Sequence, residues 1–287
     1  MSLINRIEKN LDIEDYHASE GISNSGIGLM LDCPARYYFE YVYKYEREIS
    51  ILPNGVKIEE DEEEIKAKEW AVTGQAVHTL SLEPDDFDSR FLVMPKLDRR
   101  RTEDKLIYNK LLLSGKTLLK PKQAQIAWMM AESMLRNSKF KKILQKGGNI
   151  EHSLFWQNPD GIILRSRPDF YNDFMIVDVK TTVSVDPHRF ATSIAEYGYH
   201  RQAALALDLL SALTGREYKY FAIIAVEKKW PYLSEFFQLD QNSIDIGRHE
   251  YLKGLQDYKV CKERDLWPSY TSGLHEIELP RWYKTKY

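Results

Sequence analysis

The segment from Arg165 to Thr182 constrains the fold more than any other part of this 287-residue chain. The apolar run Phe174–Lys180 predicts a buried β-strand with two charged side chains near its end. Side chains alternate between the two faces of a strand, so Asp178 and Lys180 share one face while the flanking valines share the other. The fold must therefore accommodate a carboxylate and a lysine on one face of a sheet.

Asp169 adds a second carboxylate before the turn at residues 171–173, and two interpretations of the charged groups are open. In the first, Asp178 and Lys180 form an ion pair on a solvated sheet face. In the second, the carboxylates bind a divalent metal, because Mg²⁺ prefers hard oxygen ligands, and Lys180 orients a water or steadies negative charge on a phosphate. The second interpretation predicts a site for metal-assisted phosphodiester hydrolysis.

Length and composition indicate a folded chain with enough apolar residues for a large core. We expect no membrane span and no secretory signal, because Met1–Asn10 is polar and the sequence has no apolar run of about 18 residues. The two cysteines, Cys33 and Cys261, form no CxxC pair, so neither a disulfide framework nor a zinc cluster is expected. A cytoplasmic location follows as the default.

Charge is unevenly distributed along the chain, although the formal net charge is only −3. The region Lys96–Lys146 holds 14 Lys or Arg against four Asp or Glu, whereas Ile58–Glu64 is acidic. A local basic surface can bind phosphates even on a slightly acidic protein. The basic region is therefore either a DNA contact or a solvated helix face.

The first half of the chain is predicted to be helical, with a linker at Ile49–Glu64. One helix begins near a Ser23 or Ser25 cap, and the next begins near Pro34 and carries an aromatic face that is either core or a base-stacking platform. Two further helices are expected at Lys68–Leu82 and Lys122–Asn137. His78 lies in the first of these and, judged from that segment alone, is more typical of a packed residue than of a metal ligand.

The second half alternates β-prone and helical patterns. A hairpin is expected from Glu151–Trp156 and Gly161–Arg165, followed by the strand at Phe174–Lys180, so that three successive strands form one unit. Later elements are helices at Pro187–Glu196, Tyr199–Leu213 and Ser243–Arg264, and strands at Tyr218–Val226 and Leu233–Leu239. The expected class is α/β, with a mixed sheet flanked by helices and a helical N-terminal part, and a tail from Trp267 that wraps the surface.

Several sequence blocks resemble a known nuclease superfamily. Pro168-Asp169 followed by Asp178-Val179-Lys180 resembles the PD-(D/E)xK motif. The wider set is similar, in the same order, to the exodeoxyribonuclease VIII (RecE-type) exonucleases of prophages: Tyr16-His17, Gly21–Gly26, Gly74–His78, Leu82–Pro84, Glu151 with Phe155-Trp156, Arg167–Asp169, Asp178–Thr182 and Tyr199–Ala204. The resemblance implies a restriction-endonuclease-like core, and we expect a single domain with a mainly helical part at 1–148, an α/β nuclease core at 149–265 and a tail at 266–287.

The resemblance also implies roles for individual residues. It makes His78, Asp169, Asp178 and the backbone carbonyl of Val179 ligands of Mg²⁺, for which Mn²⁺ can substitute. Lys180 would orient the attacking water, and Glu151 would be an accessory carboxylate.

Gln202 matches the first residue of a Gln-x-x-x-Tyr element of the same family. Ala206 stands where the family has tyrosine, which removes any contact made by that side chain. Cys33-Pro34 followed by Tyr37 is similar to the lead of iron–sulfur relatives, but a cluster needs four thiolates, so we expect none and interpret Cys33 as a buried small residue.

The implied activity is 5′-to-3′ digestion of linear double-stranded DNA ends, which leaves 3′ single-stranded tails for recombination. The implied partners are further copies of the chain, in a ring of three or four, and a single-strand annealing recombinase in a bacterial host of a phage or prophage. Two alternatives stay open: a PD-(D/E)xK endonuclease or single-strand nuclease, and a non-enzymatic DNA-binding module.

Overall fold

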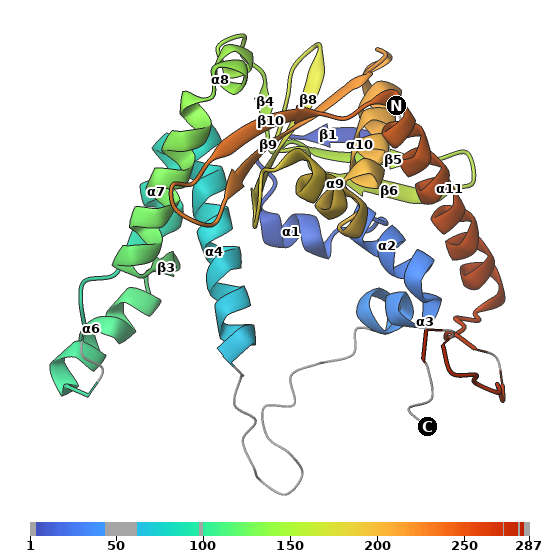
Figure 1. Ribbon diagram of the computed structural model, residues 1–287, viewed down its shortest axis with the longest axis horizontal. Helices are drawn as coiled ribbons and strands as arrows, with labels where there is room; N and C mark the ends of the chain where they lie inside the picture. Colours follow the sequence, from blue (N-terminus) through green and yellow to red (C-terminus); the bar gives the residue numbers. More distant parts are fainter. Residues whose placement is uncertain (1–3, 44–61, 98–99, 272, 281, 284–287) are drawn as a thin grey trace, which may run out of the picture.

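The computed structural model describes residues 4–43, 62–97, 100–271, 273–280 and 282–283. Figure 1 shows these residues as an arch, with the main sheet and the β1-β5-β6 sheet at the top and two mainly helical legs below them. The expected linker lies outside the described residues up to position 61, and its last three residues begin the helix α4. No helix within the described ranges has the length and apolar character that a membrane span requires.

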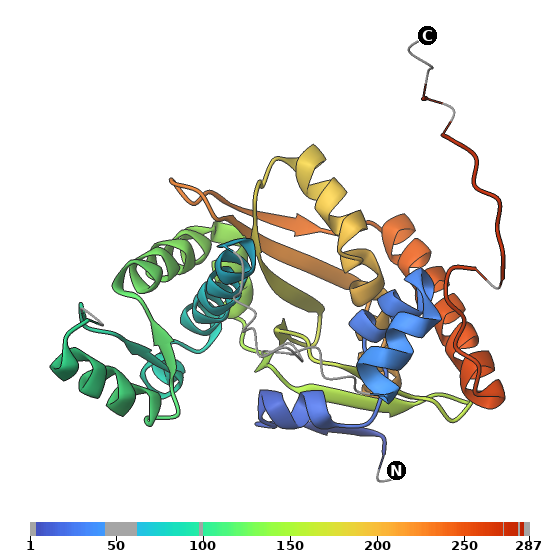
Figure 2. The same ribbon diagram turned by 90° about the horizontal axis from the view of Figure 1, so that it is seen from below.

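One leg contains α4, α6 and α7, and the other contains α2, α3 and α11, as Figure 2 shows from below. The helical elements are α1 (Ile13–Ala18), α2 (Asn24–Asp32), α3 (Pro34–Tyr37), the π-helical turn η1 (Tyr38–Val42), α4 (Glu62–Leu82), the 3₁₀ turn η2 (Pro84–Asp86), α5 (Phe87–Arg90), α6 (Thr102–Leu112), α7 (Pro121–Arg136), α8 (Ser138–Leu144), α9 (Pro187–Glu196), α10 (Tyr199–Thr214) and α11 (Gln241–Arg264).

The strands form three separate sheets. They are β1 (Arg6–Glu8), β2 (Phe91–Val93), β3 (Thr117–Leu119), β4 (Asn149–Ile150), β5 (Ser153–Gln157), β6 (Ile163–Ser166), β7 (Phe170–Tyr171), β8 (Met175–Thr182), β9 (Tyr220–Glu227) and β10 (Ser234–Gln238). The main sheet has the order β10-β9-β8-β7-β4, in which β8 and β9 are parallel and the other neighbours antiparallel. The predicted α/β class with a mixed, helix-flanked sheet is confirmed.

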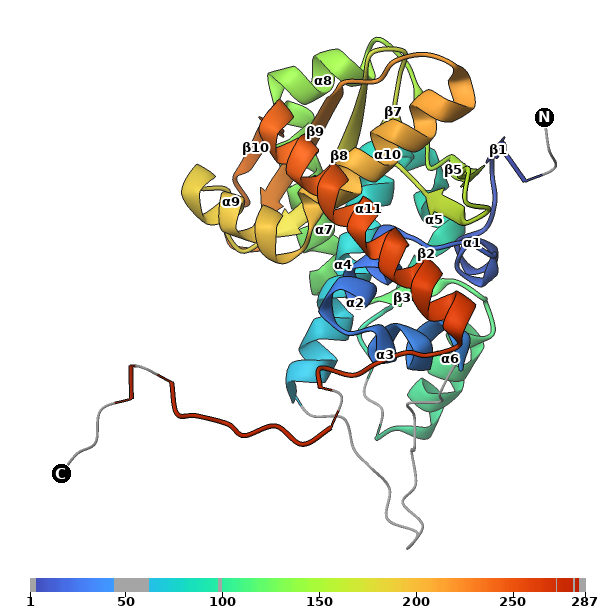
Figure 3. The ribbon, with the colours of Figure 1, turned by 90° about the vertical axis from the view of Figure 1, so that its right-hand side faces the viewer.

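The alternation along β8 divides its side chains between two cores. Ile176 belongs to the core under α10 and α11, whereas Val177 and Val179 belong to the core under α4 and α7. Asp178 and Lys180 therefore face the side of α10, as the period of two predicts. Figure 3 shows α11 packed along this side of the molecule next to α10.

The predicted three-strand unit is wrong. The hairpin β5–β6 forms correctly, but it pairs with β1 in a separate antiparallel sheet and shares no pairing with β8. The partner of β8 is instead the two-residue strand β7, which pairs through Phe170↔Val177 and Tyr171↔Ile176. Two residues are too few to show periodicity, so this strand could not be recognised from its pattern.

The N-terminal part is also less uniformly helical than expected, since it contributes β1, β2 and β3. Ser23 is the cap of α2 and accepts a hydrogen bond from the Gly26 N–H. Of the predicted aromatic face after Pro34, Tyr37 belongs to the core, Tyr38 and Tyr41 are half-buried, and Tyr45 lies outside the described residues. Tyr37 is buried and stacks on Tyr41 and Trp267 at ring separations of 5.1 and 5.6 Å.

The C-terminal tail wraps the surface only at its start. The Pro268 carbonyl accepts a hydrogen bond from the Ala35 N–H at 3.1 Å. Farther on, the tail runs away from the body, and the side chains of Leu274 and Ile277 are 100% and 93% exposed. The prediction of a wrapping tail is therefore wrong for the described segment 273–280.

The contact between α10 and α11 leads to a stability prediction. A Cβ added at Gly247 would lie 2.3 Å from the His200 carbonyl oxygen, which is backbone and cannot rotate away. Gly247→Ala should therefore lower the free energy of unfolding by roughly 1–3 kcal/mol, measured by chemical denaturation. Gly74→Ala is the matched control, because its Cβ would lie 3.7 Å from the Thr181 hydroxyl and helix propensity would improve. Equal stability of the two variants would contradict the close packing.

Candidate active site

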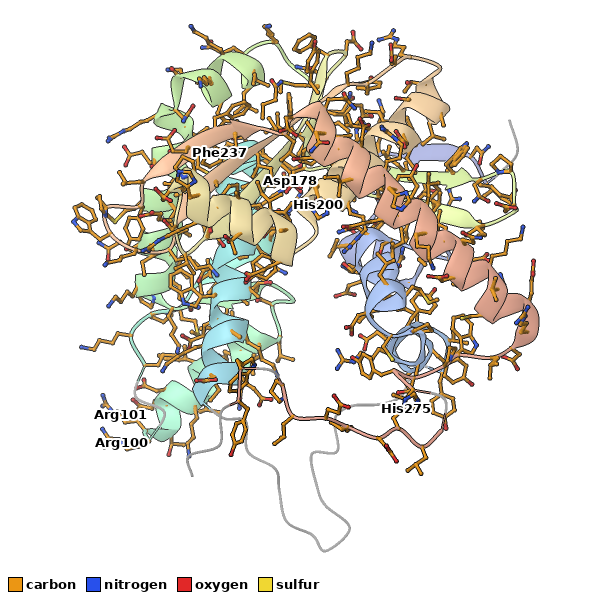
Figure 4. The ribbon with its side chains drawn as sticks, turned by 45° about the vertical axis from the view of Figure 1, so that its right-hand side comes forward. Arg100, Arg101, Asp178, His200, Phe237 and His275 are labelled. Carbon is orange, nitrogen blue, oxygen red and sulfur yellow. The ribbon has the colours of Figure 1, made fainter. Side chains whose placement is uncertain are left out.

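The candidate site lies where β8 extends beyond its short neighbour β7. No described strand pairs with this edge of β8 after Val177, so the backbone and side chains there can face a pocket. The pocket has a volume of about 350 Å³, and Figure 4 places Asp178 between the two legs at the level of the sheet. Its lining includes Glu151, Asp169, Lys180 and Gln202 together with residues of α1, α2 and the β6–β7 segment.

Asp178 is the most enclosed charged group of the site, at 1% exposure. Its Oδ1 accepts a hydrogen bond of 2.9 Å from Gln202 Nε2 on α10, and its Oδ2 lies 2.6 Å from Lys180 Nζ in an ion pair. The ammonium also lies 4.9 Å from the centre of the Tyr199 ring. Contacts on both oxygens fix the orientation of this carboxylate.

Asp169 is held by the edge of β8 and by the helix α4. Its Oδ2 accepts a hydrogen bond of 2.6 Å from the Val179 N–H, and its Oδ1 lies 3.1 Å from His78 Nε2. The N–H and C=O of one strand residue point to the same side, so the Val179 carbonyl also faces this edge. The backbone of Val179 thus belongs to the same constellation as the two carboxylates.

His78 joins two carboxylates from different parts of the chain. Its Nδ1 lies 3.0 Å from Glu151 Oε1, while its Nε2 faces Asp169. The other oxygen of Glu151 accepts a hydrogen bond of 3.1 Å from Arg167 and lies 3.6 Å from an Arg90 nitrogen. Glu151 itself adopts φ 49°, a conformation that only a well-determined environment supports in a residue with a long side chain.

The electrostatics of the site follow from burial and close charges. Burial opposes the charged imidazolium, but Asp169 and Glu151 outweigh it and raise the pKa of His78 to about 10. Burial and the neighbouring charge of Asp169 raise the pKa of Asp178 above its usual range, although Lys180 opposes this effect. Burial would also raise the pKa of Asp169, but His78 and Lys180 hold it below its usual range. The positive charges of His78 and Lys180 thus stabilise both neighbouring carboxylates, Asp169 and Asp178.

The donor set fits a divalent metal once His78 has lost its proton, since it then combines two carboxylates with a neutral imidazole. Asp169 and Glu151 stabilise the protonated imidazolium, so metal binding must release that proton. The Asp178 Oδ2 atom is buried and faces the Lys180 ammonium at 2.6 Å, so this carboxylate oxygen already lies against a positive charge. Within the described ranges, however, no three His, Cys, Asp or Glu side chains already form a metal cage. Lys180 and His78 lie against the Asp178 and Asp169 carboxylates, respectively.

The structure thus brings together every site residue predicted from the sequence: His78, Glu151, Asp169, Asp178, Val179, Lys180 and Gln202. Their roles stay predictions. Arg167 and Tyr199 lie in blocks that resemble the family, but the sequence assigned them no role; in the structure they contact Glu151 and Lys180, respectively. Sequence reasoning missed Arg90, which contacts Glu151 and lies in none of these blocks. Ala206, at the position of the family tyrosine, is buried in the core.

The sequence profile of a family described as a PDDEXK-like domain of unknown function (DUF3799) matches residues 55–278. The chain belongs to this family. The PDDEXK-like domain has a structural neighbour from Eubacterium rectale, a protein with a provisional exonuclease assignment. The TM-score is 0.59 at 14% sequence identity, over 94% of this chain and 97% of that chain.

At that identity the similarity establishes the fold, and the predicted restriction-endonuclease-like class is confirmed. An alkaline exonuclease from Laribacter hongkongensis aligns over 69% of this chain and 97% of its own, with 13% identity and a TM-score of 0.23, which is too low to support any argument. No curated protein sequence matches the PDDEXK-like chain.

Proposed function

We propose that this PDDEXK-like protein is a metal-dependent exodeoxyribonuclease that degrades linear double-stranded DNA from 5′ to 3′ and leaves 3′ single-stranded tails. One observation carries the nuclease proposal: Asp169, Asp178 and Lys180 meet at the unpaired edge of one strand, beside a pocket. A solvated surface ion pair, the alternative interpretation, does not account for an Asp178 that is 1% exposed and held on both oxygens.

Asp169, Asp178, His78 and the Val179 carbonyl are the groups that would hold Mg²⁺ or Mn²⁺, with Glu151 as an accessory carboxylate. A bound divalent cation lowers the pKa of a water and neutralises charge that develops on the phosphate. Gln202 fixes the Asp178 carboxylate through Oδ1, which leaves Oδ2 facing Lys180. Arg167 and Arg90 hold Glu151 from the side opposite His78.

Lys180 is the group that would position the nucleophile. Burial lowers the pKa of its ammonium, but Asp178 and Asp169 outweigh this effect and raise the pKa above its usual range, so the side chain stays protonated. A protonated ammonium donates to a water or to a phosphate oxygen and cannot accept a proton. Its role is therefore orientation and charge stabilisation.

The finer assignments rest on the resemblance to RecE-type exonucleases. These are the preference for DNA ends, the 5′-to-3′ polarity, a ring of three or four copies, and delivery of the 3′ tails to a single-strand annealing recombinase. A ring that encircles DNA would make degradation processive, because the enzyme would not release its substrate between cuts.

Digestion of linear duplex labelled at the 5′ or the 3′ end tests the direction of degradation. With Mg²⁺ present, we expect the 5′ label to be released at the earliest times, while the 3′ label is released only late. Equal release of both labels would contradict directional degradation. Closed circular duplex should stay intact, and its cleavage would indicate an endonuclease instead. Preferred digestion of single-stranded DNA would indicate a single-strand nuclease.

A further inference from the structure

The β9–β10 hairpin carries an exposed aromatic side chain at the same end of the sheet as the candidate site. Strands β8 and β9 are parallel and in register through Lys180↔Ala225 and Thr182↔Glu227, so the hairpin begins directly beside the end of β8. The Lys228 N–H donates to the Thr182 carbonyl at 2.8 Å. Figure 2 shows the hairpin, in orange, projecting past the edge of the sheet.

The hairpin turn is held by backbone hydrogen bonds and by contacts with the core under α4 and α7. It is closed by hydrogen bonds from the Tyr232 N–H to the Lys229 carbonyl at 2.7 Å and from the Glu227 N–H to the Leu233 carbonyl at 2.9 Å. Tyr232 is half-buried against the core under α4 and α7 and adopts φ 60°, which is uncommon for an aromatic residue. Lys228 Nζ lies 5.5 Å from the centre of the Trp70 ring on α4.

Trp230 lies at the tip of the hairpin and, unlike Tyr232, is exposed to solvent. Its side chain is 68% exposed, and its ring makes an edge contact with the Tyr232 ring at a centroid distance of 5.9 Å and an interplanar angle of 89°. An edge contact leaves the indole face open to a flat partner. Lys229, next to it in sequence, is also exposed. A large apolar surface exposed on a fixed turn beside an exposed lysine suits a ligand that is both aromatic and anionic.

We propose that Trp230 is a base-stacking platform for single-stranded nucleic acid, with the exposed Lys229 as a contact to its phosphates. Aromatic side chains bind unpaired bases by stacking, and nearby lysines bind the backbone. The platform lies beyond the strand end that carries Lys180, so it would hold an unpaired segment of the substrate at the same end of the sheet as the site of cleavage. This inference rests on the proposed nuclease function and adds a binding subsite to it.

The affinity of Trp230→Ala for an end-labelled duplex with a single-stranded tail tests the proposal. Binding is measured by fluorescence anisotropy with Ca²⁺ in place of Mg²⁺, so that binding is separated from hydrolysis. We expect about tenfold weaker binding of the tailed duplex, since one stacked base contributes roughly 1–3 kcal/mol. Blunt duplex should bind as tightly to the variant as to the wild type. Trp230→Phe should retain most of the affinity, because a smaller ring still stacks.

Phe174→Ala is the matched control. This side chain is 58% exposed, stacks on Tyr220 and lies 5.9 Å from Lys146 Nζ, but it is at the opposite end of β8. It should not change the affinity for tailed duplex. Unchanged affinity of Trp230→Ala, in a preparation whose wild type cleaves DNA, would overturn the platform and leave the proposed function standing.

Two other outcomes also decide the question. An altered oligomeric state of Trp230→Ala with unchanged DNA affinity would assign the tip to a protein contact and overturn the proposal. A wild type that hydrolyses no nucleic acid, yet binds tailed duplex through Trp230, would refute the proposed function and support the platform.

Discussion

Lys180→Gln should reduce the rate of hydrolysis of linear duplex by roughly 10²–10³-fold, because a positioned charged donor next to the reacting phosphate is lost. Glutamine is close to lysine in length and keeps a hydrogen-bond donor near Asp178, so the contact to Oδ2 is partly retained. The affinity for DNA, measured without a catalytic metal, should change little. The loss therefore should be confined to the rate at saturating DNA, measured in single-turnover reactions.

Lys253→Gln is the control for loss of a lysine charge. This lysine pairs with Asp257 on the exposed side of α11, where its side chain is 54% exposed. Its replacement should leave the rate of hydrolysis and the melting temperature nearly unchanged, since exposed ion pairs contribute little. Equal rates of hydrolysis for the wild type and Lys180→Gln would show that Lys180 takes no part in the reaction.

Asp178→Asn should abolish detectable hydrolysis, with a loss of roughly 10³-fold or more, because a metal ligand supplies several kcal/mol of charge stabilisation. The effect of Asp178→Asn on hydrolysis should also be distinguishable from its effect on folding. In EDTA the variant should still fold but be less stable than the wild type by roughly 1–3 kcal/mol, because asparagine keeps the oxygen that Gln202 contacts but removes the charge that pairs with the enclosed Lys180 ammonium.

Thermal unfolding with and without Mg²⁺ provides the second readout for Asp178→Asn. The wild type should gain about 2.7 kcal/mol when the metal is 100-fold above its dissociation constant, whereas the variant should gain far less. Asp257→Asn, in the exposed pair on α11, should keep the full metal-dependent gain. A metal-dependent gain in Asp178→Asn equal to that of the wild type would place the metal elsewhere.

The parts of the fold that local patterns determine were predictable from the sequence. The helix Pro187–Glu196 has the predicted bounds, because Pro187 lies in its first turn and the Asp186 side chain caps the Arg189 N–H. The shared face of Asp178 and Lys180 follows from the period of two in a strand. Such features depend on neighbours within a few residues, which the sequence displays directly.

The parts that depend on distant contacts were not predictable in this way. His78 could not be placed between Glu151 and Asp169 by spacing, since the helix and the sheet edge are far apart in the chain. Only the resemblance brought it into the site. The hairpin β5–β6 was assigned to the wrong sheet because its partner β1 is a three-residue strand at the start of the chain.

Release of nucleotides from uniformly labelled linear duplex by the wild type and by Asp178→Asn tests the central claim most directly. The wild type should release acid-soluble nucleotides with Mg²⁺ and none in EDTA, and Asp178→Asn should release none in either. A wild type inactive with both Mg²⁺ and Mn²⁺, or an Asp178→Asn variant that hydrolyses DNA at the wild-type rate, would contradict a nuclease centred on this strand end.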